Sequence, residues 1–307
     1  MNDVAIETCH LSKTFDRSVQ AVANLDLKIP RGVVYGLIGR NGAGKTTLIR
    51  LLMGLLRPTG GAASVLGTSM WKATCAQRQR VAYVSQSQQS DAWMTVGELC
   101  HYVGSLYQRW DMPYAQRLAN RFGLPWDKPV GILSGGQQRK AAVLLAFASR
   151  AEVLLLDEPA AGLDPIARRE LITEMVDIIA EGNGTTILLS THIISDLERI
   201  AEYVGVMDQG RMSLSEASLS DLQARTRRVQ VVFEGSPPRG FAIPGAIRSK
   251  TEGPVITAVV NVATEGQLDG IRGLPGVRVN EFPMGLEDIF IELFGPASDK
   301  EPTEQPR

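Results

Sequence analysis

The chain has 307 residues, of which 44% are hydrophobic and 21% are charged, so it is long enough to bury one sizeable core and a small second one. Its 32 basic and 33 acidic side chains are interspersed and give a formal charge of −1, which argues against the extended basic face that charge-driven binding of nucleic acid requires. Cys9, Cys75 and Cys100 lie far apart without CxxC spacing, so their spacing suggests neither a disulfide framework nor a zinc site.

The chain begins without a basic segment followed by an apolar stretch, so we expect no secretory signal. Its apolar runs, such as Val153 to Leu156, are far shorter than the roughly 20 residues that cross a bilayer as a helix. We therefore expect a chain that stays in a reducing cytoplasm and reaches a membrane only through a partner.

The first two thirds of the sequence predict an α/β fold. Residues 4–10 and 25–29 are expected to be strands joined by polar turns, which gives a small antiparallel β layer at the N-terminus. Val33 to Ile38 then form a buried strand that leads through a Gly-rich turn into a helix over residues 46–56. Other near-continuous hydrophobic runs, typical of central parallel strands in a doubly wound core, cover residues 81–84, 153–156, 186–189 and 204–207.

The pattern then changes twice along the chain. An inserted helical subdomain is predicted at about residues 90–149 of a main domain that covers residues 1–224. Beyond it the composition shifts to Gly, Pro and Val, which predicts a small C-terminal α+β accessory domain over residues 225–295. Its expected strands are Val229 to Phe233, Val255 to Val262 and Val277 to Phe282, and its last helix is Leu286 to Phe294. The polar residues 296–307 are expected to be disordered.

A phosphate-binding loop is predicted at residues 39–46, whose sequence Gly-Arg-Asn-Gly-Ala-Gly-Lys-Thr matches GxxxxGK[ST] between a strand and a helix. The glycines let backbone N–H groups converge on phosphate oxygens, Lys45 can reach the β- and γ-phosphates, and the Thr46 hydroxyl can ligate Mg²⁺. The alternative is an ordinary Gly-rich turn. The candidate residues here are Gly39, Asn41, Gly42, Ala43, Gly44, Lys45, Thr46 and Thr47.

Two acids, Asp157 and Glu158, end a predicted buried strand. Because an unpaired buried carboxylate is costly, acids at the carboxyl end of a strand favour a site with a cation nearby. Asp157 is expected to hold Mg²⁺ through its water shell, and Glu158 is expected to act as a general base on the attacking water. The alternative is a plain polar loop, which is less favoured because the phosphate loop is present.

The run Leu133-Ser134-Gly135-Gly136-Gln137 matches in full the LSGGQ signature of ABC ATPases and lies upstream of the two acids, as it does in that family. Over about residues 4–210 the chain therefore resembles the ATP-binding subunits of ABC transporters. The resemblance implies a P-loop ABC-type ATPase core that binds ATP and Mg²⁺. It also implies that Ser134, Gly135, Gly136 and Gln137 contact the γ-phosphate of an ATP held by a second subunit, which makes the active site composite.

Four further residues take roles only from the resemblance. Gln86 is similar to the Q-loop glutamine that touches Mg²⁺ and the attacking water, and His192 to the switch histidine at the γ-phosphate. Asp164 resembles the D-loop aspartate that links the subunits, and Phe15 occupies the position of an adenine-stacking aromatic that is more often tyrosine. The structural alternatives are a solvated glutamine, a structural histidine, a helix N-cap for Asp164 before Pro165, and an ordinary surface or core aromatic for Phe15.

The resemblance implies a motor subunit on the cytoplasmic face of the cell membrane, paired with a second nucleotide-binding subunit as a homodimer or heterodimer and with a separate transmembrane permease. Residues 285–290 resemble the ending of bacterial exporter subunits, which favours export, although the same segment is also explained by an amphipathic helix packed on its own domain. Glu158 is present, so the chain does not resemble the degenerate half of an asymmetric pair. The transported substrate is expected to be set by the permease.

Three alternatives compete with the transporter interpretation. A soluble ABC-type ATPase that acts on ribosomes or DNA usually carries two cassettes or a long coiled coil, and the interval between Lys45 and Asp157 has no room for the latter. A scaffold such as the ATPase of iron–sulfur cluster assembly would not need the C-terminal domain. The LSGGQ run argues against a P-loop kinase or GTPase.

Overall fold

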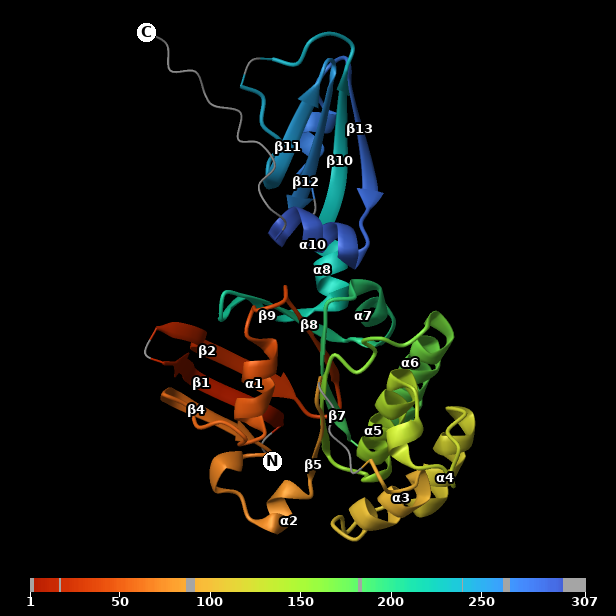
Figure 1. Ribbon diagram of the computed structural model, residues 1–307. Helices are drawn as coiled ribbons and strands as arrows, with labels where there is room; N and C mark the ends of the chain where they lie inside the picture. The colour runs from red at the N-terminus through yellow and green to blue at the C-terminus, as the bar shows by residue number, and fades with distance from the viewer. Residues whose placement is uncertain are drawn as a thin grey trace. The chain divides into compact units, whose positions relative to one another are not determined.

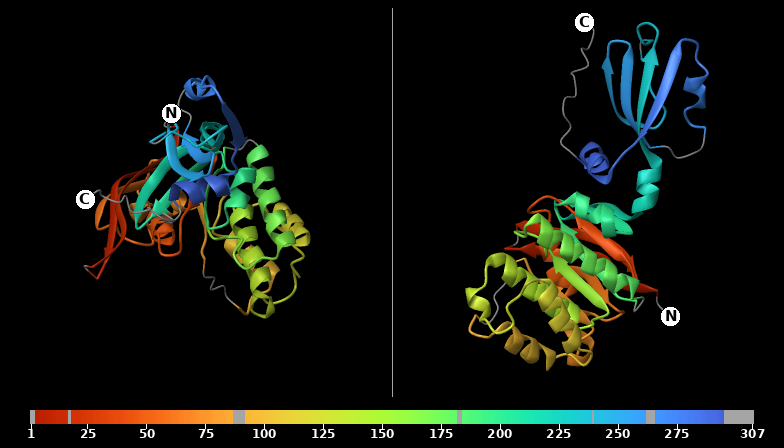
Figure 2. Two further views of the ribbon diagram at one scale, coloured as in Figure 1. Left: turned by 90° about the horizontal axis from the view of Figure 1, so that it is seen from above. Right: turned by 90° about the vertical axis from the view of Figure 1, so that its right-hand side faces the viewer.

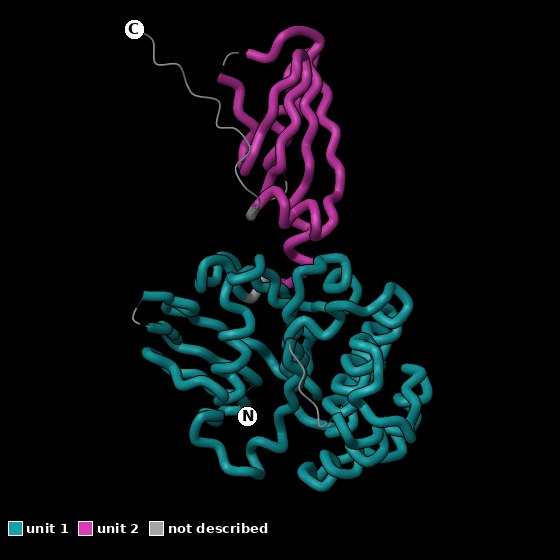
Figure 3. The backbone as a smooth tube through the Cα atoms, in the orientation of Figure 1, with its two compact units in different colours: residues 1–217 teal, residues 218–307 magenta. Residues whose placement is uncertain are grey.

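The structure is a computed structural model that describes residues 3–16, 18–86, 92–181, 184–238, 240–261 and 266–294. The chain divides into two compact units, residues 1–217 and 218–307 (Figure 3). The sequence places this boundary at residue 225, whereas the second unit starts at Ser218. The reason is that helix α8 (Leu219–Arg225) contacts β10 and α10 of the second unit. The expected disordered segment 296–307 lies outside the described residues.

A six-stranded sheet forms the centre of the first unit, in the order β5-β6-β7-β3-β8-β9. The neighbours from β5 to β8 pair in parallel, so their carboxyl ends meet at one edge and the predicted α/β core is confirmed. The strand bounds are β3 Val34–Ile38, β5 Val81–Val84, β6 Val153–Asp157, β7 Thr186–Thr191, β8 Tyr203–Asp208 and β9 Arg211–Ser218.

A second, three-stranded sheet in the order β2-β1-β4 makes the predicted β layer. Its strands are β1 (Val4–Phe15), β2 (Val19–Pro30) and β4 (Gly60–Val65), and both pairings are antiparallel. The first two strands are longer than expected, because their pairing continues to the hairpin, where Phe15 lies opposite Val19. The third strand was not predicted, since its run of Gly, Ala and Ser has little β propensity.

Helices cover both faces of the central sheet (Figure 1 and Figure 2). Helix α1 and the β layer lie on one side, and α5 and α6 lie on the other. The bounds are α1 Lys45–Leu52, α2 Cys75–Arg78, α3 Val96–Gly104, α4 Met112–Arg121, α5 Gly135–Ala148, α6 Pro165–Ala180 and α7 Ile194–Ile200, with 3₁₀ turns η1 Met70–Lys72 and η2 Val130–Ile132. Helices α3, α4 and α5 contact one another and occupy the segment predicted as the helical subdomain.

Helix α1 stops at Leu52 rather than continuing to Leu56 as the sequence predicts. Gly54 adopts φ +70°, a left-handed conformation that ends helices, and a Cβ there would lie 2.5 Å from the carbonyl carbon of Met70. The body of α1 is fixed by the main core, in which Leu48 and Ile49 are fully buried. That core joins α1 to apolar side chains of the β layer and of the central sheet, so the start of α1 is rigidly placed.

The second unit is a four-stranded antiparallel sheet in the order β11-β12-β10-β13. Its elements are β10 Thr226–Phe233, β11 Ala246–Glu252, β12 Val255–Asn261, β13 Val277–Pro283, α9 Asp269–Arg272 and α10 Leu286–Phe294. Side chains on β12 alternate between two small cores: Ala258 and Val260 join one, while Val259 packs with Ile289 of α10 in the other. Helix α10 is therefore packed on its own domain. The sequence did not predict β11, because this edge strand is polar and largely exposed.

In the described part of the chain, no helix is both long enough and apolar enough to cross a membrane.

Candidate active site

The loop between β3 and α1 forms an open pocket of about 240 Å³ at the carboxyl-end edge of the central sheet. Gly44 is the N-cap of α1 with φ +106°, and a Cβ there would lie 2.2 Å from the Ala21 carbonyl oxygen. Only glycine fits such a position. The loop thus brings backbone N–H groups and a helix N-terminus to the pocket, which suits an anion such as phosphate. The lining residues are Ala21, Arg40, Asn41, Gly42, Ala43, Gly44, Lys45, Thr46, Thr47, Gln86 and Glu158.

Lys45 is buried at the base of this pocket with only 6% of its side chain exposed. Its Nζ donates a hydrogen bond of 2.7 Å to the Gly39 carbonyl oxygen and lies 3.6 Å from Oε1 of Glu158. These contacts hold the ammonium group beside a carboxylate and within the loop that the sequence assigns to phosphate. Gly39 itself does not line the pocket in the described structure and acts as a backbone acceptor for Lys45.

Glu158 follows strand β6 and adopts φ +51°, an unusual conformation for a residue with a side chain. Strain of this kind costs roughly 1–3 kcal/mol and is found preferentially at functional sites. The Glu158 backbone N–H donates to the Ser190 carbonyl oxygen at 3.1 Å. Its carboxylate has Lys45 at one oxygen and His192 Nδ1 at 2.7 Å from the other. A carboxylate only accepts, so Nδ1 carries the proton of this hydrogen bond.

Asp157 ends β6 with none of its surface exposed. Its Oδ1 accepts a hydrogen bond of 2.7 Å from the Ser190 hydroxyl, while Oδ2 is buried without a hydrogen-bond partner among the described residues. An orphaned buried carboxylate oxygen is costly unless a cation or its water shell satisfies it. The donor set therefore fits Mg²⁺, for which Thr46 and Gln86 are the further candidate ligands.

Gln86 lines the pocket from the end of β5 and is exposed. Its backbone is held by Arg139 of α5, whose guanidinium donates to the carbonyl oxygens of Ser85, at 2.7 Å, and of Gln86. Burial lowers the pKa of Arg139, and the nearby charges of Asp157 and Glu158 oppose that shift. Helix α5, which starts at the LSGGQ run, is thus joined directly to the segment that holds Gln86.

The LSGGQ run opens α5 as a capping box. Ser134 is the N-cap: its Oγ accepts from the Gln137 backbone N–H at 3.3 Å, and its own N–H donates to Gln137 Oε1 at 3.1 Å. Ser134 and Gly135 are exposed, and in the described structure neither they nor Gly136 and Gln137 line the phosphate pocket of their own chain. The run therefore forms a second anion-compatible surface, separate from the first.

Asp164 is the N-cap of α6 and accepts hydrogen bonds of 2.9 Å from the backbone N–H groups of Ile166 and Ala167. The Ala167 N–H also lowers the pKa of the Asp164 carboxyl. The capping alternative is thus realised, and the link across a subunit interface stays a prediction. Asp164 lies near the LSGGQ run, because a Cβ on Gly136 would be 3.7 Å from the side chain of the adjacent Leu163.

Phe15 lies at the end of β1 with 37% of its surface exposed and does not line the phosphate pocket as described. The ammonium group of Lys13 lies 5.1 Å from the centre of its ring. A half-exposed ring beside a cation can stack on a base. Its role at adenine stays a prediction.

Two residues that matter for this geometry were missed by sequence reasoning. Ser190 holds both Asp157 and the backbone of Glu158, and Arg139 holds the Gln86 segment. Ser190 stands next to the Thr191-His192 pair at the end of its strand, so the sequence offered a weak signal. The pairing of Asp157 with Ser190 depends on the register of β6 and β7, which periodicity does not reveal.

Comparisons with known proteins show which proteins the chain is similar to. Residues 22–161 match the family model described as ABC transporter. The chain is 33% identical over 287 residues to a Nod factor export ATP-binding protein I of Cupriavidus pinatubonensis, with 89% of this chain and 86% of that protein covered. It is 29% identical over 290 residues to the ABC transporter ATP-binding protein YtrB of Bacillus subtilis, with 94% and 98% covered. A solved structure of an ATP binding subunit of an ABC transporter superposes with TM-score 0.65 at 27% identity, over 72% of this chain and 92% of that one.

Proposed function

We propose, from the premise that this chain belongs to the ABC transporter family as one of its ATP-binding proteins, that two copies of it close on two ATP molecules and thereby drive export through a separate permease. ATP binding and ATP hydrolysis follow from membership of this family. The homodimeric pairing, the residue roles, the permease and the direction of transport are the proposal.

One observation supports the pairing of two chains: the phosphate pocket and the anion-compatible LSGGQ surface of a single chain are separate. The phosphate pocket is lined by the 39–47 loop, Gln86 and Glu158, with no contribution from the LSGGQ residues of the described chain. Because the chain has a complete set of both surfaces, two copies related by a two-fold axis would complete each other at two equivalent sites. Two copies of this chain are therefore sufficient to form both sites, and the homodimer is the pairing that we propose.

Hydrolysis in such a site rests on charge stabilisation and on one positioned water. Lys45 would meet the developing charge on the terminal phosphate, while Ser134 of the second copy approaches from the opposite side. Glu158 would take the proton from the attacking water and is oriented for this by His192. When bound at Thr46, Gln86 and Asp157, Mg²⁺ supplies neutralisation of phosphate charge.

The proposed location is the cytoplasmic face of the cell membrane, where the chain is held by a permease. A relative that covers most of this chain is named for Nod factor export, which supports export over import. The segment after Gln86, residues 87–91, lies outside the described structure. The hydrogen bonds from Arg139 to Ser85 and Gln86 nevertheless provide a physical route by which the site and the helical subdomain would move together.

A mixing experiment tests the composite site. Glu158→Gln removes the base, and Ser134→Asp keeps a good N-cap while placing a negative charge against the phosphate. Each variant alone should be nearly inactive. In an equimolar mixture, half of the pairs are mixed and each mixed pair holds one intact site, so we expect about a quarter of the wild-type ATPase rate. If the mixture is no more active than its parts, the active site lies within one chain.

Purification from detergent extracts tests the transporter role. We expect a polytopic membrane protein to co-purify with the tagged chain and to stimulate its ATPase rate. Recovery only with soluble or ribosomal material would instead favour a soluble ABC-type ATPase.

A further inference from the structure

A bulge in the β layer brings together three side chains that the proposed ATP site does not use. On β1, Thr8 lies opposite Leu27 and Leu11 lies opposite Leu25, so two residues of β1 face the single residue Asp26 of β2. The two residues that share this position are Cys9 and His10. In a regular strand, neighbouring side chains point to opposite faces, whereas a bulge can turn both to one face.

The burial pattern agrees with that placement. Cys9 and His10 are both exposed although they are consecutive in the strand, and they stand between the buried residues Thr8 and Leu11. Asp26 is likewise exposed. All three side chains therefore lie on the outer face of the β layer, and the core lies behind the other face.

Backbone conformation and a hydrogen bond at His10 stabilise the bulge. His10 adopts φ +47°, which is unusual for a residue with a side chain. Its N–H donates a hydrogen bond of 2.6 Å to Asp26 Oδ1. On the neighbouring strand β4, a Cβ on Gly61 would lie 2.2 Å from the His10 carbonyl oxygen and 2.4 Å from that of Cys9. The close approach of β4 to β1 thus needs glycine at position 61.

The three side chains offer one sulfur, one imidazole nitrogen and one carboxylate oxygen, all within 4.8 Å of one another. His10 Nδ1 and Asp26 Oδ2 are 3.4 Å apart, close to the roughly 3.5 Å that separates two ligands on one tetrahedral zinc ion. Thiolate, imidazole and carboxylate are the ligand types that zinc takes, and three protein ligands leave a position for water. Cys9 is exposed on the same face, and its sulfur lies within 4.8 Å of the other two ligand atoms.

We propose that Cys9, His10 and Asp26 bind one zinc ion on the outer face of the β layer. The cysteine spacing along the chain suggested no zinc site, because spacing reveals only ligands that are near one another in sequence. The third ligand comes from another strand, and pairing of β1 with β2 supplies it. No residue of this cluster lines the phosphate pocket as described, so the metal site is separate from the site for ATP and Mg²⁺.

Cobalt(II) and zinc titrations of the full, metal-free chain test this proposal. Co²⁺ bound to a thiolate gives a sulfur-to-metal charge-transfer absorption band, and we expect one equivalent of Co²⁺ to produce it and one equivalent of Zn²⁺ to remove it. Cys9→Ser should abolish the band. Asp26→Asn and His10→Asn should weaken Zn²⁺ binding by about 10-fold or more. Asn is the chosen replacement for His10 because it tolerates positive φ.

Cys75→Ser is the matched control, since Cys75 is also exposed but lies outside the cluster; the band should persist in this variant. Cys100 is buried and lies outside the cluster, and burial raises the pKa of its thiol to about 12, so we expect it to contribute no band. Metal bound at His192, beside Glu158, would give no sulfur band. If wild type shows no band, if the band survives Cys9→Ser, or if Zn²⁺ affinity is unchanged by Asp26→Asn and His10→Asn, the proposal is overturned.

Discussion

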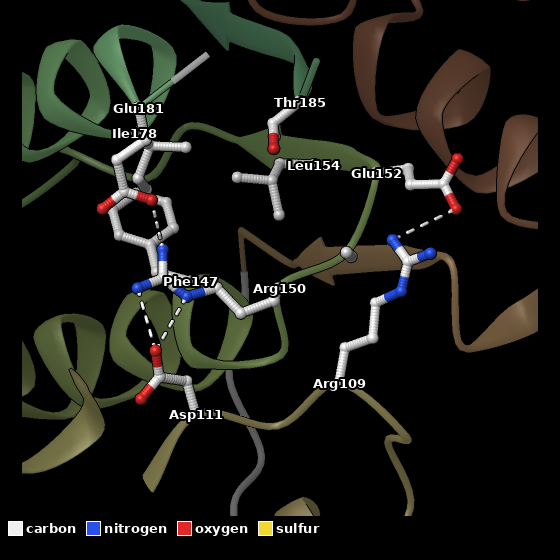
Figure 4. A pocket seen from close by; sticks show the side chains of 10 residues that line it. Arg109, Asp111, Phe147, Arg150, Glu152, Leu154, Ile178, Glu181 and Thr185 are labelled. Carbon is white, nitrogen blue, oxygen red and sulfur yellow. Dashed lines mark hydrogen bonds and ion pairs between the residues drawn. The ribbon is translucent and has the colours of Figure 1, made fainter. Parts of the chain in front are cut away.

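Charged side chains lie at both edges of the central sheet, but the charges are more completely paired at the amino-end edge than at the carboxyl-end edge. At the amino-end edge a pocket of about 400 Å³ lies beside Glu152, the residue before β6 (Figure 4). Arg80 holds the Glu152 carboxylate through two hydrogen bonds of 2.7 Å, and Arg31 and Arg109 approach it at 3.7 and 3.6 Å. The hydrogen bond from Arg80 lowers the pKa of Glu152.

Arg150 is equally well paired on the other side of the same pocket. It donates hydrogen bonds to Asp111 at 3.0 Å and to Glu181 at 2.8 Å, as Figure 4 shows, and its guanidinium lies 3.9 Å from the centre of the Tyr114 ring. Each of these charges has an opposite charge beside it. The amino-end cluster thus has the character of a structural network that ties α4, α5 and α6 to the sheet.

The carboxyl-end pocket is smaller, yet it is lined by residues to which we assign the chemistry. Glu158 bears a strained backbone there, next to the buried Lys45. The preceding residue, Asp157, keeps one oxygen buried without a hydrogen-bond partner in the described structure. Pocket volume therefore does not select the candidate active site that we propose. The unsatisfied and strained polar groups do, because a bound ligand would offset their cost.

The largest expected effect is on kcat, when one glutamate at each edge of the sheet is replaced by glutamine. Glu158→Gln should lower kcat by about 10²- to 10⁴-fold, because the general base is lost, while ATP still binds. Glu152→Gln, the matched change at the amino-end edge, should leave kcat within a factor of about two. Steady-state ATPase assays with equilibrium ATP binding measure both. Equal losses of kcat in the two variants would remove the functional distinction between the edges.

Ser190→Ala tests whether the position of Asp157 matters. The variant removes the hydroxyl that donates to Asp157 Oδ1, so we expect the Mg²⁺ concentration for half-maximal ATPase activity to rise by about 10-fold. Ser149→Ala is the control, since among the described residues this buried hydroxyl bonds the Ala146 carbonyl oxygen of its own helix and lies away from Asp157. An unchanged Mg²⁺ dependence in Ser190→Ala would mean that the serine does not position the aspartate.

Arg150→Gln should act on stability alone. It breaks a partly buried ion pair with Asp111, an exposed one with Glu181 and the contact with Tyr114, so the free energy of unfolding in urea should fall by about 2 kcal/mol. The kcat of the folded protein should stay at the wild-type value. A loss of kcat without a loss of stability would show that the amino-end edge takes part in catalysis.

The smallest effect is expected at Phe15. Phe15→Ala should raise the Kd for ATP about fivefold, or about 1 kcal/mol, through lost stacking, and Phe15→Tyr should restore it. Fluorescent-nucleotide titration measures both. If Phe15→Ala binds ATP as wild type does, adenine lies elsewhere.

Local patterns predicted most of the framework. The parallel strands are continuous apolar runs, and β5 was expected at the bounds observed. The phosphate loop and the two acids follow such strands, so their meeting at one edge could be inferred. Long-range pairing was out of reach: the contact of Ser190 with Asp157, the Arg139 bonds to the Gln86 segment and the bulge at Cys9 all depend on register or tertiary packing. The edge strands β4 and β11 were missed because they are short of apolar residues.

The molar mass of Glu158→Gln in solution with and without ATP tests the central claim most directly. Light scattering after size exclusion should give the mass of one chain without nucleotide or with ADP, and twice that mass with saturating ATP and Mg²⁺. Adding Ser134→Asp to the same chain should return the ATP-bound sample to one mass. A single-chain mass for Glu158→Gln at saturating ATP, with nucleotide binding verified in the same sample, would contradict the account.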